Sequence, residues 1–118
     1  MTETFALSDL EDNLRHVLLD LAAAPRAHRP YVIVQDSVTG RFVQMATCSK
    51  CEEFIFDVPG KADFPKTENC IIGSISRHAK SIDELLLWSR STLSGPLRLP
   101  PEATLEIRFE TTEAGKDG

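Results

Sequence analysis

The sequence of 118 residues lacks a long apolar run and an excess of basic charge. A membrane-spanning helix needs about 20 consecutive apolar residues, and no stretch of the sequence approaches that length, so we predict that the chain does not enter a membrane. The net charge is −5 at pH 7. A chain of that sign has no overall positive field to attract phosphate backbones, which argues against nucleic acid as a partner.

Cysteine is scarce as well. The chain has three cysteines, an odd number that fits poorly with a disulfide framework and better with a reducing compartment. The first residues, MTETFALSDLEDNL, carry acidic side chains where a secretory signal would carry basic ones before an apolar block. Together these features predict a cytoplasmic protein.

Motifs for catalysis are also lacking. The sequence has no glycine-rich phosphate loop, no G-x-S-x-G and no H-E-x-x-H. The histidines His16, His28 and His78 are scattered, and a dyad of Cys70 with His78 would need a contact in the fold that the sequence does not reveal. We therefore predict a non-enzymatic protein with no catalytic residues.

The length fits one domain spanning residues 1–118. A domain of this size buries roughly two-thirds of the surface of its unfolded chain, which is enough for a single core. We expect flexible ends at residues 1–7 and 111–118, because the first residues of a domain are seldom held and the tail TTEAGKDG has little to bury.

Two helices are predicted from capping boxes at Ser8–Glu11 and Ser81–Glu84. After the first box, leucines recur at helical spacing until Ala24, before Pro25. The second helix contains the contiguous run Leu85–Trp88, so it is apolar on more than one face. It is therefore either nearly buried or in contact with a partner.

Strands are predicted from three alternating runs within residues 29–58, namely YVIVQD, RFVQMATC and EEFIFDV, which read as an antiparallel meander. A fourth strand is expected at Cys70–Ile75, with a helix as the alternative, and a last strand at Thr104–Glu110. The order α-β-β-β-β-α-β indicates an α+β fold: a two-layer sandwich with a mainly antiparallel sheet of four or five strands and two helices on one face.

The pair Cys48 and Cys51 lies in the break between the second and third strands. Such a turn can direct two thiolates at one zinc ion, and Cys70 and His78 would complete the ligand set. The alternative is a polar turn beside one small buried cysteine, with no cofactor. A redox role is disfavoured, because redox pairs of this kind lie at a helix N-terminus.

Four apolar side chains are candidates for partner binding. Phe64 is the apolar residue of a long loop at residues 59–69, which is either a binding loop or a simple crossover. Leu86, Leu87 and Trp88 belong to the apolar run of the second helix.

The helix followed by V-x-V-x-D-x-x-T-G-R-F-V-Q-M-A at Val32–Ala46 resembles bacterial type III secretion chaperone-like domains, over residues 8–58. The resemblance implies a small, acidic, cytoplasmic and often dimeric protein that binds extended segments of other proteins and has no catalytic residues. We therefore expect a chaperone-like or immunity-type protein-binding module, which binds a protein partner or a second copy through a sheet edge or an apolar helix surface. The alternative is a small zinc-binding domain that uses Cys48, Cys51, Cys70 and His78.

Overall fold

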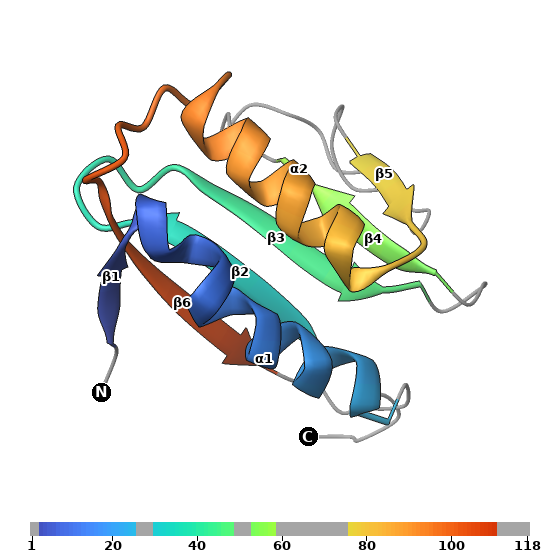
Figure 1. Cartoon of the computed structure of the whole chain (residues 1–118). Helices are drawn as coiled ribbons and strands as arrows, with labels where there is room; N and C mark the ends of the chain where they lie inside the picture. Colours follow the sequence, from blue (N-terminus) through green and yellow to red (C-terminus); the bar gives the residue numbers. More distant parts are fainter. Residues whose placement is uncertain (1–2, 26–29, 49–52, 59–75, 111–118) are drawn as a thin grey trace.

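The computed structural model describes residues 3–25, 30–48, 53–58 and 76–110. In these parts of the chain, two helices lie on one face of a six-stranded antiparallel sheet (Figure 1). The predicted α+β sandwich is confirmed, with one strand more than expected. The elements are β1 (Thr4–Ala6), a 3-10 turn (Leu7–Asp9), α1 (Leu10–Ala23), β2 (Tyr31–Asp36), β3 (Phe42–Thr47), β4 (Phe54–Asp57), β5 (Ser76–Ala79), α2 (Ile82–Ser94) and β6 (Thr104–Glu110).

The strand order across the sheet is β1-β6-β2-β3-β4-β5. The predicted meander is confirmed, because β2, β3 and β4 are consecutive antiparallel neighbours. The last strand, β6, is inserted between β1 and β2 and pairs with both. As a result β1 and β5 are the outermost strands of the part of the sheet that the structure describes.

The N-terminal segment differs from the prediction. Residues 1–7 were expected to be flexible, but Thr4–Ala6 form strand β1, with Phe5 opposite Leu105 of β6. Leu7 is buried, and its backbone N–H donates a hydrogen bond of 2.9 Å to the carbonyl of Ala103. The segment is held in place because it pairs with β6. That partner strand lies far along the chain, so local sequence patterns do not reveal the pairing.

Several predictions fall outside the described residues. Those that concern the fold are the fourth strand at Cys70–Ile75, the loop at residues 59–69 and the flexible tail at 111–118. Among the described residues, the strand that follows β4 along the chain is β5, which pairs with β4 so that His78 lies opposite Ile55. The assignment of the whole chain to one domain stays a prediction.

The core lies between the helices and the sheet. Val32 and Val34 of β2 project toward the helices and are fully buried, as are the leucines of α1 that recur at helical spacing. On the β4 side, the ring of Phe56 meets that of Trp88 from α2 edge-on, with 5.8 Å between ring centroids. The face of β4 that carries Phe56 therefore packs on the helices. The buried leucines of α1 are Leu10, Leu14, Leu18 and Leu21.

The turn between β2 and β3 is held by a buried carboxylate. Asp36 accepts hydrogen bonds from the backbone N–H groups of Val38 at 3.2 Å and Thr39 at 2.6 Å. Gly40 has a φ of 79°, in the left-handed region that favours glycine, and its N–H donates to the carbonyl of Asp36. The first two strands of the predicted meander are therefore joined by a tight hairpin.

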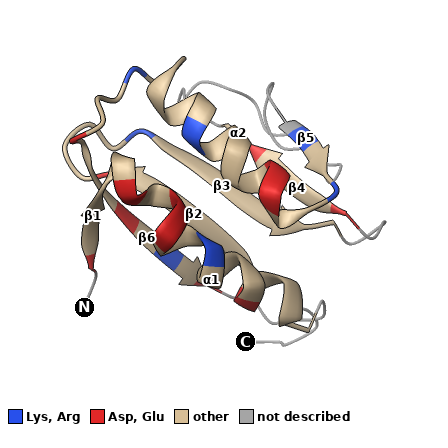
Figure 2. Cartoon of the chain, in the orientation of Figure 1, with Lys and Arg blue, Asp and Glu red and all other residues tan. Residues whose placement is uncertain are grey.

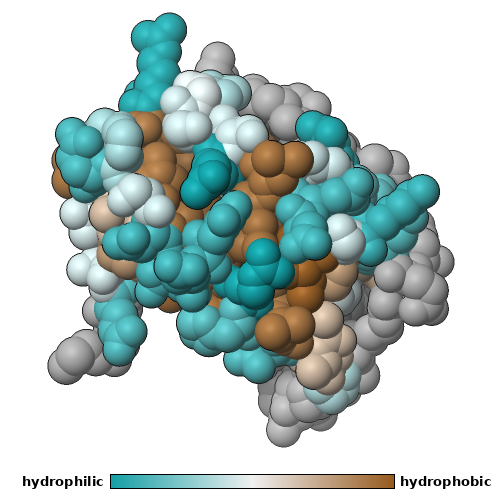
Figure 3. Space-filling view, in the orientation of Figure 1, coloured by the Kyte–Doolittle hydropathy of each residue, from teal (hydrophilic) through white to brown (hydrophobic). Residues whose placement is uncertain are grey.

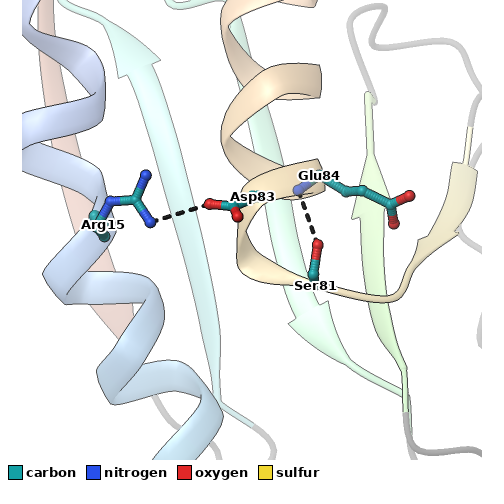
Figure 4. Close-up of polar contacts among 4 residues, drawn as sticks. All are labelled: Arg15, Ser81, Asp83 and Glu84. Carbon is teal, nitrogen blue, oxygen red and sulfur yellow. Dashed lines mark hydrogen bonds and ion pairs between the residues drawn. The ribbon is translucent and has the colours of Figure 1, made fainter.

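Of the two predicted capping boxes, only the serine cap of the second forms, and its glutamate accepts the N–H of the residue before the serine. The hydroxyl of Ser81 accepts the N–H of Glu84 at 3.2 Å (Figure 4), and the Glu84 carboxylate accepts the N–H of Lys80 at 2.7 Å. The first prediction is wrong: Ser8 lies in the 3-10 turn, and α1 begins at Leu10 without a side-chain cap. The N–H of Ser8 donates instead to the carbonyl of Pro101, so a long-range contact replaces the local one.

Candidate partner-binding site

The two helices lie side by side and run antiparallel. Two ion pairs cross between them: Arg15 with Asp83 at 3.1 Å (Figure 4), and Arg90 with Glu11 at 3.8 Å. All four side chains are largely solvent-exposed, so each pair contributes little to stability. They place charged side chains on the outer surface of the helix layer.

The apolar run of α2 is mostly used inside the protein. Leu86 is only 2% exposed and belongs to the core. Trp88 is half-buried; one side of it meets Phe56, and the guanidinium of Arg77 lies 3.9 Å from the centroid of its ring system. Of these predicted partner-binding residues of α2, only Leu87 is well exposed, at 57%. Phe64 lies outside the described residues.

Leu87 does not by itself define a docking surface. It lies on the outward side of α2 between Asp83 and Arg90, which form the two ion pairs with α1. Figure 3 shows apolar surface on this side of the molecule interrupted by hydrophilic side chains. Single exposed leucines are common on soluble proteins and need no partner.

The predicted zinc ligands are only partly described. Cys48 is buried at the end of β3, where its N–H donates to the carbonyl of Glu53 at 3.0 Å. Cys51 and Cys70 lie outside the described residues. Strand alternation places Cys48 and His78 on the sheet face that points away from the helices, with β4 between them. Within the described ranges, no group of three or more potential metal ligands is found.

A site that the sequence did not indicate is a cavity of about 250 Å³ at the β1 end of the sheet, on the helix side. Its residues come from the N-terminal strand region, from α1 and, far along the sequence, from β6. The lining side chains are Glu3, Phe5, Asn13, His16, Val17, Ile107 and Phe109.

The floor of the cavity is apolar because of the strand register. Phe5 is opposite Leu105, whereas Ile107 and Phe109 are opposite Val34 and Val32 of β2, so all of these side chains point toward the helices. The pairing of β1 with β6 ends at Glu106, but β6 continues to Glu110. Phe109 is 39% exposed as a result. The alternating pattern of β6 was the signal that could have identified this floor.

Strand β1 lies at the edge of the sheet, next to β6 (Figure 1), and its residue Phe5 lines the cavity. The hydrogen bond from Leu7 N–H to Ala103 shows that odd-numbered residues here direct their backbone groups toward β6. The backbone groups of Thr4 and Ala6 therefore point away from the sheet. In the described part of the chain, no strand pairs with this edge.

The surroundings of the cavity are acidic. Glu3 lines it, and Asp12 and Asp20 are exposed on α1, four residues before and after the lining residue His16. No lysine or arginine is among the described residues of its lining. Figure 2 shows acidic residues at the start of β1 and along α1, where Arg15 is engaged with Asp83.

Arg108, the basic residue of β6, lies on the sheet face opposite to the cavity. Arg108 pairs there with Glu110 at 3.9 Å. The same carboxylate accepts a 2.5 Å hydrogen bond from the hydroxyl of Tyr31, which raises the pKa of the phenol. Arg108 is thus engaged away from the cavity and does not neutralise the acidic side chains around it.

Comparison with known protein families, with curated proteins and with solved structures finds no match to this chain. Across the described ranges, neither α1 nor α2 has the length and apolar character needed to cross a bilayer.

Proposed function

We propose that this chain is a non-enzymatic, chaperone-like or immunity-type module that binds an extended segment of a protein partner at the β1 edge of its sheet. The observation that carries the proposal is the juxtaposition of an outward-facing strand edge with an apolar cavity. When a peptide adds to a sheet edge, backbone hydrogen bonds provide affinity and neighbouring pockets select side chains. Both parts of such a site are present here.

The sheet edge is favoured over the apolar helix surface. Leu86 lies in the core and Trp88 is engaged by Phe56 and Arg77, so little of the apolar run of α2 remains for a partner. The cavity, in contrast, has Phe109 at its floor with 39% of its surface exposed. Self-association and a cytoplasmic location stay predictions.

A phage-displayed library of random 12-residue peptides, selected against the immobilised full chain, tests the proposal. We expect enriched peptides that bind in solution with dissociation constants of about 1–100 μM, because short linear segments lose much of their binding energy to ordering. Selection on the support without protein is the control. If no enriched peptide binds the chain in isothermal titration calorimetry, the proposal is wrong.

The alternative proposal is a small zinc-binding domain. Its support is that Cys48 and His78 lie on the same face of the sheet. Elemental analysis of protein purified without chelator decides between the two proposals. One zinc per chain, lost in a folded Cys48→Ser variant, would favour the zinc domain, because thiolate ligands dominate affinity at such sites. A substoichiometric zinc content is the result we expect, and it removes this alternative.

A further inference from the structure

We infer that the segment bound at the β1 edge is basic and inserts one apolar side chain into the cavity between α1 and β6. The inference rests on the proposed function and specifies the chemistry of the partner. It combines the cavity, the outward backbone groups of Thr4 and Ala6, and the acidic side chains around them.

The apolar part of the inference follows from strand geometry. A strand added outside β1 would alternate its side chains between the two faces of the sheet, and those on the helix side would lie next to Phe5. Phe5 lines the cavity together with Val17 and Ile107. A cavity of about 150 Å³ can hold a benzene molecule, so the volume here of about 250 Å³ accommodates a phenylalanine or leucine side chain.

Because β1 is short, the apolar side chain of the bound segment must contribute much of the binding energy. The strand has three residues, and only Thr4 and Ala6 direct backbone groups outward. Few backbone hydrogen bonds can therefore form with a partner, and each contributes modestly because it replaces bonds to water. Burial of an apolar side chain and attraction between charges must provide most of the affinity.

The basic character of the bound segment is inferred from the acidic side chains around the cavity. Glu3 is in the lining, and Asp12 and Asp20 are exposed on α1 one turn before and after His16. The chain as a whole carries a net charge of −5. A second copy of this chain would bring like charge to an acidic edge, whereas a lysine- or arginine-containing segment complements it.

The test uses one enriched peptide as the probe and compares variants of the full chain by isothermal titration calorimetry. His16→Trp fills the cavity from an exposed helix position, and we expect about tenfold weaker binding because the apolar side chain of the peptide is excluded. Glu3→Lys reverses the charge at the cavity, and we expect about three- to tenfold weaker binding and a smaller dependence of affinity on salt.

Two matched controls change exposed residues elsewhere. Leu87→Gln removes the exposed apolar side chain of α2, and Glu102→Lys makes the same charge reversal beyond the far end of β1. Both should bind the peptide as the unchanged protein does. Circular dichroism verifies that every variant is folded, which is expected because Glu3 and His16 are both exposed.

The outcomes separate the inference from the proposed function. If no peptide is selected, both are wrong. If peptides bind but lack basic residues, or if Leu87→Gln weakens binding while His16→Trp does not, the protein binds peptides at another site and only the inference is wrong. Apolar, basic peptides whose binding requires an open cavity and Glu3 would support both.

Discussion

Phe56→Ala is expected to lower the free energy of unfolding by about 3–5 kcal/mol, the usual cost of deleting a buried aromatic side chain. Phe56 is 2% exposed and lies between Met45 and Arg77 on the helix-facing side of the sheet. Its ring also meets Trp88 edge-on, at an interplanar angle of 68°. Alanine would therefore leave a cavity under α2 and remove one of the contacts that hold the indole in place.

The effect can be measured by urea denaturation followed by the fluorescence of Trp88, the one tryptophan in the sequence. In the folded variant we expect emission at longer wavelength, because the indole gains contact with water. Phe56→Leu keeps most of the volume and should cost only about 1–1.5 kcal/mol, which keeps the comparison measurable if the alanine variant fails to fold. A loss below 1 kcal/mol for Phe56→Ala would contradict this account of the core.

Asp36→Ala is the second substitution with a large expected effect, a loss of about 2 kcal/mol in the free energy of unfolding. The carboxylate of Asp36 is the acceptor for the N–H groups of Val38 and Thr39, and the residue is only 3% exposed. Without it, the turn between β2 and β3 keeps the backbone hydrogen bond from Gly40 but loses both side-chain bonds.

Asp36→Asn is the matched control for the turn. Its side-chain oxygen can accept the same two N–H groups, since asparagine forms the same kind of turn, so the loss should be clearly smaller. Denaturation curves of the two variants give the comparison. Equal stability of Asp36→Ala and the unchanged protein would mean that Gly40 and the backbone bonds hold the turn without the carboxylate.

Features set by neighbouring residues were predictable from the sequence. The hairpin at Asp36–Arg41 and the cap of α2 at Ser81 depend on contacts within a few residues, and both formed as expected. The alternation of residues 104–110 also gave the correct strand. In each case the local pattern and the long-range packing favour the same conformation.

Features set by distant residues were not predictable in the same way. Strand β1 exists because Phe5 meets Leu105, and the start of α1 is displaced because Ser8 bonds to Pro101. The cavity likewise depends on three separate segments. A sequence pattern reports which side of an element is apolar, but it does not report which other element covers that side.

The run Leu85–Trp88 shows how a pattern can have two explanations. Four consecutive residues of a helix face different directions, so the run suggested an apolar surface available to a partner. In the structure, Leu85 and Leu86 are in the core and Trp88 contacts the sheet, because α2 packs on both β3 and β5. Burial thus accounts for all of the run except Leu87.

The insertion of β6 between β1 and β2 has a consequence for folding kinetics. Tyr31 and Glu110 are neighbours in the sheet although they lie 79 positions apart in the sequence. Pairings of such long range are slow to form, and sheets dominated by them fold in about milliseconds to seconds. Until β6 pairs with β2, the backbone groups along that edge of β2 are unpaired, and this apolar strand can pair with another chain. Aggregation during refolding should therefore begin at this strand, before the last segment of the sheet is in place.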